Sequence, residues 1–340
     1  MPDGTPVGRP YLVGEADPAL AQRTARLYEI WPGKNRFFCQ GCCITGGSET
    51  VSPPCFGPET ICAWVCILLP SFLYFIVGAP VFVDKVSVVV PVVVLGIFAL
   101  TIVSLLLTCC TDPGIIPRRS VILAAGTAEQ LTAALGYNVL GTGDDSTENS
   151  ARVPADLRQM GFKWCATCKI VRPPRASHCS DCDCCVLRFD HHCPFVNNCV
   201  GQRNYRFFVM FTTSVCLLAG TVLPSLAFVL LHYQRAALRD DDDDATESDE
   251  SSSWSWHWIL LAALGCVVAL ASLLVCVLWS YHVFLMFTGQ TTKEHWTAVR
   301  RSSGSIPKVR DLHRFPSATG TRGPRLFQPR QYVAVDGCPV

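Results

Sequence analysis

The chain has 340 residues, of which 50% are hydrophobic and only 16% are charged, and its mean hydropathy is +0.31. Soluble domains contain about a quarter charged residues, so this composition predicts membrane segments. The net charge of +1 and the lack of basic stretches interleaved with aromatic residues exclude nucleic acid as a partner. Twenty cysteines would suit a secreted disulfide scaffold, but such scaffolds are small and soluble.

Residues 1–60 contain no apolar run long enough for a signal peptide, so we expect this N-terminal segment to be retained. Four apolar runs follow, each long enough to cross ~30 Å of hydrocarbon as a helix. They are residues 61–83, 86–110, 207–231 and 258–287. The predicted fold class is therefore an all-α polytopic membrane protein with four transmembrane helices. Prolines are tolerated in membrane helices, so kinks and not breaks are expected at Pro70, Pro80, Pro91 and Pro224.

The distribution of lysine and arginine predicts the orientation of these helices. Five of these residues precede the first run, one lies before the second, eleven before the third and two before the fourth, and nine follow the fourth. Because basic residues favour the cytoplasmic side, both termini, including residues 288–340, and the middle loop are predicted to be cytoplasmic. The short loop at Asp84 and the acidic loop 232–257 would face the lumen or exterior, and the acidic run is expected to be a solvated linker without a function.

The middle loop divides into two parts. Residues 111–162 are predicted to be mainly linker, because residues 120–158 are poor in aromatic residues and rich in Gly, Thr, Ala and Asp, with one short helix. Residues 163–206 instead concentrate eleven cysteines and histidines, namely Cys165, Cys168, His178, Cys179, Cys182, Cys184, Cys185, His191, His192, Cys193 and Cys199. A reducing cytoplasmic face disfavours disulfides, whereas these spacings suit tetrahedral zinc. Two zinc ions need eight ligands, so some of these residues are left over.

A structural zinc module has little use for a spare cysteine beside a histidine and an aspartate. Asp190, His191 and Cys193 form such a group. The thiolate is the reactive form of cysteine, and a thiol with a pKa of ~8.5 is only slightly ionised at neutral pH. His191 could accept the thiol proton and Asp190 could orient the imidazole, as in cysteine hydrolases.

The cysteine-rich segment resembles that of a known protein family. The segment from Cys165 to Phe208 resembles the cysteine-rich domain of the DHHC palmitoyltransferases, and the similarity extends over residues 28–296. The matching motifs are Arg-Pro-Pro-Arg at 172–175, Ala-Ser-His-Cys at 176–179, Arg-Phe at 188–189, Asp-His-His-Cys at 190–193 and Cys-Val-Gly-Gln-Arg-Asn-Tyr-Arg-Phe-Phe at 199–208.

The resemblance implies a small zinc-stabilised domain of short β-hairpins between the second and third membrane helices, with two interleaved Cys3His sites. One zinc ion would be bound by Cys165, Cys168, His178 and Cys185, and the other by Cys179, Cys182, His192 and Cys199. Palmitoyl-CoA or another long-chain acyl-CoA would acylate Cys193, with His191 as the base and Asp190 as its orienter. The implied activity is S-acylation of cysteines in membrane-associated proteins, at the surface of the lipid bilayer.

Two further stretches match the family where the topology places them. Asp112-Pro113-Gly114 follows the second helix, and Thr291-Thr292-Lys293-Glu294 follows the fourth. The resemblance implies that the latter packs against the cysteine-rich domain, with Thr291 and Glu294 as organisers of the site. The stretch from Trp31 to Cys39 is similar to a Ras-type and Golgi-type subgroup. This implies an endomembrane location, in the Golgi or endoplasmic reticulum ahead of the plasma membrane, and adds an accessory subunit as a candidate partner.

The sequence departs from the family pattern at three places. Phe195 replaces the usual Trp after Asp-His-His-Cys-Pro, which is a conservative aromatic change. Cys184 is an extra thiol beside Cys185, and either could coordinate the first zinc ion, although spacing favours Cys185. No match to the family's Asn-centred aromatic motif follows Glu294, which leaves the docking of the tail undecided.

Two other classes of protein compete with this interpretation. In a zinc-binding interaction module, such as a membrane ubiquitin ligase finger, Cys193 would be a passive thiol. A transporter or channel should have ionisable residues within its spans, and these runs contain no Lys, Arg, Asp or Glu, with His282 the one candidate. A structural hydrogen bond is the expected role of His282.

Overall fold

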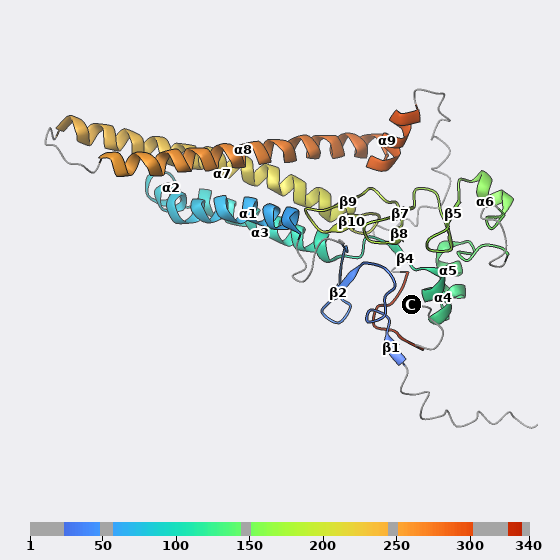
Figure 1. Cartoon of the computed structure of the whole chain (residues 1–340). Helices are drawn as coiled ribbons and strands as arrows, with labels where there is room; N and C mark the ends of the chain where they lie inside the picture. The colour runs from blue at the N-terminus through green and yellow to red at the C-terminus, as the bar shows by residue number, and fades with distance from the viewer. Residues whose placement is uncertain (1–23, 48–56, 144–150, 244–250, 302–325, 335–340) are drawn as a thin grey trace, which may run out of the picture.

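The computed structural model describes residues 24–47, 57–143, 151–243, 251–301 and 326–334. The long helices form one elongated bundle (Figure 1). The short strands and small helices gather at one end of this bundle, where the N-terminal and C-terminal segments also lie (Figure 1). The molecule therefore has a helical part suited to a membrane and a hairpin-rich part at one end of it.

The first helical run is continuous but changes its winding. Helix α1 (Pro58–Leu73) leads into a π-helical segment, η1 (Tyr74–Gly78), and then into α2 (Ala79–Lys85). Pro70 lies within α1. A proline cannot donate the usual helical hydrogen bond, and the Ser71 hydroxyl donates to the Ile67 carbonyl oxygen at 2.7 Å in this turn. The helical run continues through the proline, and the departure from α-helical winding follows one turn later.

Three more long helices complete the bundle: α3 (Val89–Cys110), α7 (Tyr205–Asp243) and α8 (Ser251–Thr288). Within the part of the chain that the structure describes, four segments are long and apolar enough to cross a membrane, namely Pro58–Lys85, Val89–Cys110, Tyr205–His232 and Gly265–Thr288. Helix α7 packs against both α3 and α8. The predicted fold class, a four-helix membrane protein with a cysteine-rich hairpin region between the second and third spans, is confirmed.

Helix α7 continues well beyond its apolar part. It runs to Asp243, and α8 begins at Ser251, so both helices extend into the segment predicted as the acidic loop 232–257. The sequence from Arg235 to Arg239 is rich in Ala, Leu and Arg, which are strong helix formers. Helix-forming residues thus continue in the sequence after the apolar run has ended. Part of the acidic run, residues 244–250, lies outside the described residues.

Polar side chains join α7 to its neighbours inside the bundle. The indole Nε1 of Trp279 in α8 donates to the Thr213 hydroxyl in α7 at 2.8 Å. The hydroxyls of Ser104 in α3 and Ser214 in α7 lie 3.4 Å apart. Such bonds between helices contribute about 1 kcal/mol each in a membrane.

In the part that the structure describes, residues 120–158 contain more structure than the predicted linker with one short helix. Three short helices form there: α4 (Arg119–Ala124), α5 (Ala128–Leu135) and α6 (Ala155–Gln159). Their aliphatic side chains and those between them are buried against the first hairpin of the cysteine-rich region, chiefly Ile122, Leu131, Val139 and Val153. The segment is poor in aromatic residues but not in aliphatic ones, and the aliphatic residues are enough to pack it.

The two ends of the chain meet beside this packed segment. Strand β1 (Thr24–Arg26) pairs antiparallel with β11 (Tyr332–Ala334). We call residues 326–334 the C-terminal strap. Its Phe327 is 6% exposed and stacks on Trp31 with ring centroids 4.7 Å apart. The docking of the tail, which the sequence left undecided, therefore takes place on the N-terminal segment.

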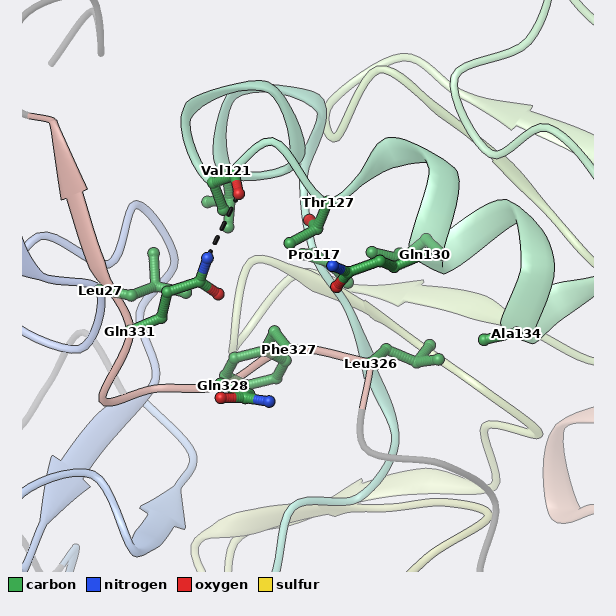
Figure 2. Close-up of a pocket in the computed structure, with 12 residues that line it drawn as sticks. Leu27, Pro117, Val121, Thr127, Gln130, Ala134, Leu326, Phe327, Gln328 and Gln331 are labelled. Atoms are coloured by element: carbon green, nitrogen blue, oxygen red, sulfur yellow. Dashed lines mark hydrogen bonds between the residues drawn. The ribbon is translucent and has the colours of Figure 1, made fainter.

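A cavity of about 200 Å³ lies between the strap and the helices α4 and α5 (Figure 2). The Gln331 side chain crosses one side of it and donates to the Ala125 carbonyl oxygen at 3.3 Å. The N-terminal segment continues into a hairpin, β2 (Arg36–Phe38) and β3 (Cys43–Thr45), which packs against α3. The strap, the hairpin and the packed segment thus surround the cysteine-rich region.

Candidate active site and metal centres

Three β-hairpins of the cysteine-rich region are spaced at intervals of 14 residues. The first pairs β5 (Lys163–Cys165) with β6 (Ile170–Arg172), the second β7 (Ser177–Cys179) with β8 (Cys184–Val186), and the third β9 (His191–Cys193) with β10 (Asn198–Val200). Strand β8 also pairs with β4 (Ile115–Ile116). In each turn the residue before the second strand has a positive φ: Lys169, Asp183 and Asn197. The same hairpin is therefore built three times.

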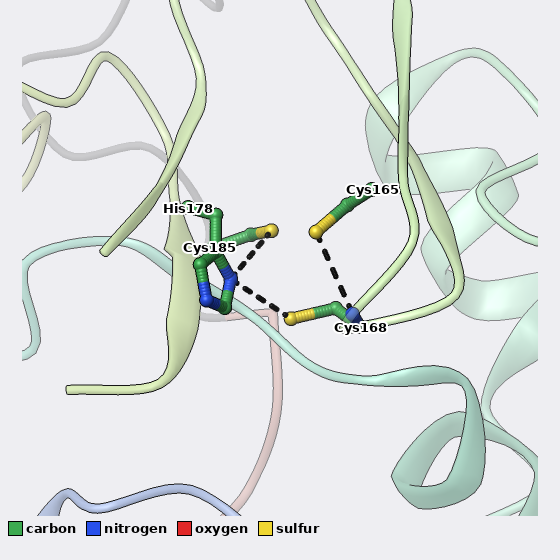
Figure 3. Close-up of side chains that lie close together, drawn as sticks. All are labelled: Cys165, Cys168, His178 and Cys185. Carbon is green, nitrogen blue, oxygen red and sulfur yellow. Dashed lines mark hydrogen bonds between the residues drawn. The ribbon is translucent and has the colours of Figure 1, made fainter. Parts of the chain in front are cut away.

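The first candidate metal site lies between the first and second hairpins (Figure 3). Cys165 and Cys168 come from the turn of the first hairpin, and His178 and Cys185 come from facing positions on the strands of the second. The four candidate ligand atoms lie within 4.8 Å of one another. His178 Nδ1 is 3.4 Å from Cys168 Sγ and 3.9 Å from Cys185 Sγ.

The second candidate metal site repeats this arrangement one hairpin further along. Cys179 and Cys182 come from the turn of the second hairpin, and His192 and Cys199 face each other on the strands of the third. His192 Nδ1 is 3.4 Å from Cys182 Sγ and 3.8 Å from both Cys179 Sγ and Cys199 Sγ. The second hairpin thus contributes to both sites, which makes them interleaved.

These separations fit a zinc ion. Zn–S bonds of ~2.3 Å and Zn–N bonds of ~2.1 Å at tetrahedral angles place sulfur about 3.6 Å from nitrogen and about 3.8 Å from another sulfur. The observed separations of 3.4 to 3.9 Å agree with that geometry. Cys3His is also a donor set that zinc prefers. Both clusters could therefore hold zinc, which would fix the hairpins to one another.

Cys184 belongs to neither group of candidate ligands and lies beside Cys182 and Cys199 of the second site, whereas Asp183 adjoins the first site. The structure groups Cys185, and not Cys184, with Cys165, Cys168 and His178. Asp183 Oδ1 lies 3.5 Å from His178 Nε2, and Arg118 forms an ion pair with the same carboxylate. A carboxylate on the second nitrogen of a ligating histidine fixes its ring and its tautomer.

Asp190, His191 and Cys193 are brought together on the third hairpin. The His191 Nδ1–H donates to Asp190 Oδ2 at 2.7 Å. His191 also hydrogen-bonds the Cys193 thiol. Because Nδ1 is taken by Asp190, Nε2 is the nitrogen that remains for Cys193. A thiol, an imidazole and a carboxylate therefore follow one another, joined by hydrogen bonds.

Charge favours the ionised form of this thiol. Burial raises the pKa of Cys193, but the hydrogen bond and charge of His191 and the turn amides of Val196 and Phe195 lower that pKa below its ordinary value. Burial lowers the pKa of His191, but its hydrogen bonds with Asp190 and Cys193 raise it to about 9. Burial also raises the pKa of Asp190, and the bonds from His191 and Thr292 outweigh this and leave it low. The three shifts all act in favour of the charged forms, namely a thiolate, an imidazolium and a carboxylate.

The turn amides that stabilise the Cys193 thiolate are a feature that the third hairpin shares with the first. In the first hairpin the Cys168 amide donates to Cys165 Sγ at 3.5 Å, which stabilises a zinc-binding thiolate. Val196 occupies the equivalent position in the third hairpin, and its amide stabilises Cys193. Cys193 therefore occupies the place of a zinc ligand. It has no metal partners because Val196 replaces the second turn cysteine and no fourth hairpin follows within the described residues.

The environment of Cys193 is apolar on the side that faces the bundle. Its side chain is 7% exposed and belongs to the same buried cluster as residues of the long helices, among them Ile67, Leu105, Phe208 and Phe211. The Thr60 hydroxyl of α1 donates to the Pro194 carbonyl oxygen at 2.7 Å. The thiol therefore lies at the junction of the hairpins with the membrane helices. Phe195 in the same turn is 51% exposed.

Thr291 and Glu294 form a capping box at the start of α9 (Thr292–Arg301). The Glu294 amide donates to the Thr291 hydroxyl at 3.3 Å, and the Thr291 amide donates to Glu294 Oε2 at 2.8 Å. Glu294 also accepts two hydrogen bonds from the Arg175 guanidinium, at 2.7 and 2.9 Å. This bidentate pair attaches α9 to the cysteine-rich region, as the resemblance implied.

Thr292 is a site residue that sequence reasoning missed. Its amide donates to Asp190 Oδ1 at 2.9 Å and its hydroxyl to Asp190 Oδ2 at 2.7 Å. Asp190 thereby caps the N-terminus of α9 while it holds His191, and helix N-termini favour negative charge. A capping-box pattern beside the site, with a hydroxyl at the first helical position, is the signal that could have indicated this contact.

Asp112 stabilises the turn that follows α3. Its Oδ1 accepts hydrogen bonds from the amides of Gly114 and Ile115 at 2.9 and 3.0 Å, and Oδ2 lies 3.4 Å from Arg203 Nε. Gly114 has a φ of +109°, a conformation that favours glycine. The turn after α3 is thus fixed to the segment that leads into α7.

The fold and site define a membrane protein with paired Cys3His clusters and a buried thiol, imidazole and carboxylate at their membrane edge. Residues 158–299 match the family model described as DHHC palmitoyltransferase. This part of the chain is therefore a domain of the DHHC palmitoyltransferase family.

The chain is similar to several curated members of that family. Palmitoyltransferase ZDHHC18-B of Danio rerio is 40% identical over 218 residues, which are 64% of this chain and 53% of that protein. Human palmitoyltransferase ZDHHC18 is 36% identical over 211 residues, 60% of this chain and 49% of the relative. Human palmitoyltransferase ZDHHC14 is 39% identical over 207 residues, which are 61% of this chain and 40% of that protein. The chain spans about half the length of these relatives, or less.

Proposed function

We propose that the chain is a protein S-acyltransferase that moves a long-chain acyl group from acyl-CoA through Cys193 to cysteine thiols of membrane-associated proteins. The observation that supports this most is the placement of the Cys193 thiol. It is hydrogen-bonded to His191, outside both metal clusters, and buried in the apolar cluster of the membrane helices. The relatives named as palmitoyltransferases point to the same activity.

The reaction would take place in two steps, each with its proton accounted for. His191 accepts the thiol proton, the Cys193 thiolate attacks the thioester carbonyl carbon, and the carbon–sulfur bond to coenzyme A breaks. Coenzyme A then leaves as a thiol with the proton from His191. In the second step His191 takes the proton of an acceptor cysteine, whose thiolate attacks the acyl-Cys193 thioester. The bond between the acyl carbon and Cys193 breaks, and Cys193 regains the proton from His191. Such a covalent intermediate gives ping-pong kinetics.

The metal clusters take no part in these bond changes. Zinc in the two Cys3His sites would stabilise the hairpins, because structural zinc sites contribute directly to folding. The third hairpin carries Asp190, His191 and Cys193 on or beside β9, and His192 and Cys199 from the same hairpin would bind the second zinc ion. Metal binding would therefore hold the reacting groups in register.

The acyl chain would lie among the membrane helices. A sixteen-carbon chain gains ~0.8 kcal/mol per buried methylene, so its transfer is easiest if it stays buried. The apolar cluster around Cys193 supports this placement. The coenzyme A head would stay outside the bilayer, where a cavity of about 230 Å³ next to Asp190 is lined by Arg188 and Arg206. These two cations suit phosphate groups.

We place both termini and the hairpins in the cytoplasm, in an endomembrane of the Golgi or endoplasmic reticulum. The pairing of β1 with β11 puts both terminal segments on the side of the hairpins, which agrees with the cytoplasmic side given by the lysine and arginine counts. Substrates with cytoplasmic cysteines near the bilayer, and an accessory subunit, are the proposed partners.

The test is covalent labelling of the purified full chain with palmitoyl-CoA. Wild type should acquire a hydroxylamine-sensitive acyl label and transfer it to an acceptor thiol, whereas Cys193→Ser should not. The matched control is Cys184→Ser, a buried cysteine of the same region that belongs to neither metal cluster. Cys193→Ser protein that labels as well as wild type would overturn the proposed nucleophile. Label that no protein thiol can remove would instead indicate a thioesterase or an inactive relative.

A further inference from the structure

His282 is a buried histidine of the membrane helix α8 that lies beside the proposed reacting groups. Its side chain is 1% exposed. A polar group buried without a partner costs free energy, so its surroundings indicate why it is tolerated. Its Nδ1 lies 3.2 Å from the hydroxyl of Tyr205, the first residue of α7. We call these two residues the Tyr205–His282 pair.

Three rings meet at this point. The ring of His282 lies 5.8 Å from that of His191 and 4.9 Å from that of Phe208, measured between centroids. The rings of His191 and Phe208 are 5.3 Å apart, edge to face. The base of the proposed mechanism is therefore packed against an apolar ring from α7 and an imidazole from α8, which also contact each other.

His282 also approaches the polar side of the site. One of its nitrogens lies within 4.8 Å of a ring nitrogen of His191 and of a carboxylate oxygen of Asp190. This group does not have the character of a third metal site, because the Asp190 oxygens already accept three hydrogen bonds, two from Thr292 and one from His191. A metal ion would have to break the bond that orients the base.

The Asp190 bond alone does not fix the base. A single hydrogen bond to Nδ1 leaves the imidazole free to swing about that bond, which would move Nε2 away from Cys193. Rings packed against the imidazole remove this freedom. The His282 ring can pack against His191 in one orientation only, because a hydrogen bond with the Tyr205 hydroxyl holds the His282 ring in place.

We propose that the Tyr205–His282 pair is a positioning element, which holds the His191 imidazole so that Nε2 faces Cys193. His282 acts through His191 and does not itself touch the acyl group. The pair also connects the hairpin-side ends of α7 and α8 to the base. The packing of two membrane helices thereby sets the geometry of proton transfer.

The test measures single-turnover acylation of Cys193 over a range of palmitoyl-CoA concentrations, in the full-length chain, and the inference rests on the proposed function. His282→Phe keeps a planar ring but loses the bond to Tyr205. A misplacement of ~1 Å can slow a reaction about 100-fold, and we expect about a tenfold lower rate at saturation. The half-saturating concentration should not change. Tyr205→Phe, which leaves His282 in place, should lose part of the rate.

Two controls separate positioning from general packing. Trp279→Phe removes a different hydrogen bond between α7 and α8, from Trp279 Nε1 to the Thr213 hydroxyl, and should acylate at the wild-type rate. In a His191→Ala background, His282→Phe should slow the residual labelling no further. Wild-type rates in both His282→Phe and Tyr205→Phe, or an equal loss with and without His191, would overturn the inference. A wild-type chain that acquires no label would overturn the proposed function, and the inference with it.

Discussion

The chemistry available to Cys193 depends on residues that lie far from it in the chain. Asp190 holds His191, and Thr292 holds Asp190 through two hydrogen bonds from a separate helix. Bonds to a charged carboxylate are worth about 1.5–3 kcal/mol each. The orientation of the His191 imidazole is therefore maintained by the segment that follows α8 as well as by the hairpin itself.

Thr292→Val should slow acylation of Cys193 about tenfold, because it removes the hydroxyl donor to Asp190 while keeping the branched shape. Thr292→Ser keeps the donor and should retain most of the rate. The measurement is single-turnover acylation at saturating palmitoyl-CoA. Equal rates for the valine and serine variants would show that the hydroxyl has no role in orienting the base.

Zinc content should distinguish Cys168, a candidate ligand of the first metal site, from Cys184, which belongs to neither group of candidate ligands. Cys168→Ser should lower the zinc bound to the purified chain from about two ions to about one, because structural zinc sites are four-coordinate. Cys184→Ser should leave both ions. Elemental analysis after gel filtration measures this directly. Loss of zinc in the Cys184 variant, with retention in the Cys168 variant, would contradict the grouping of the ligands.

At the scale of elements, the 14-residue repeat explains why the metal sites interleave and why Cys193 is not in either. Each site takes two cysteines from one turn and a histidine and a cysteine from the next hairpin. In the third hairpin the turn retains its first cysteine, but Val196 replaces the second. Cys193 thus occupies a ligand position without metal partners, and its thiolate is still stabilised by the turn amides.

Val196→Cys should convert this turn into a redox-sensitive one. The variant recreates Cys-x-x-Cys, and mild oxidation by diamide would remove one hydrogen from each thiol and join Cys193 to the new cysteine. Acyl labelling should then be lost after oxidation and restored by a reductant, since the thiolate is the nucleophile.

Val196→Ala is the matched control for that experiment, because it also removes apolar volume from the turn. It should label equally with and without oxidant. Mass spectrometry of the linked peptide would identify the bond. If the cysteine variant labels as well after oxidation as before it, the two positions do not face each other as Cys165 and Cys168 do.

Much of this architecture could be predicted from the sequence, for specific reasons. Long apolar runs define the membrane helices regardless of their partners, and the cysteine and histidine spacing indicates paired metal sites. The contact between Thr292 and Asp190 joins residues 102 positions apart, so spacing along the chain does not reveal it, and the capping-box pattern at 291–294 is the one local signal for it. The sequence predicted one short helix within a linker and not the packed helices α4 and α5, because their few aliphatic residues lie in a composition typical of linkers.

At the scale of the whole molecule, the C-terminal strap holds the N-terminal segment in place. Phe327→Ala should expose β1 and β11, since it removes the stack on Trp31 and the contact with Phe37, whose ring centroid lies 6.5 Å away. Truncation of a buried Phe costs about 3–5 kcal/mol in a core. Faster hydrogen exchange of the β1 and β11 amides is the expected result.

Gln328→Ala is the control for the strap, because Gln328 is exposed and adjacent. In the Gln328→Ala variant, the amides of β1 and β11 should exchange at wild-type rates. Unchanged exchange of β1 in the Phe327 variant would mean that the backbone pairing of β1 and β11 holds the two segments together without the aromatic stack.

The pairing of β1 with β11 has a consequence for how the protein is made. The strands are separated by about 300 residues and by every membrane crossing, and closing so long a loop is entropically costly. β11 follows all four long helical segments in the chain, so this sheet can close only after they have been synthesised. A chain with one helix left out would have its ends on opposite sides and could not form this sheet. The sheet is therefore compatible only with an even number of crossings between its two strands.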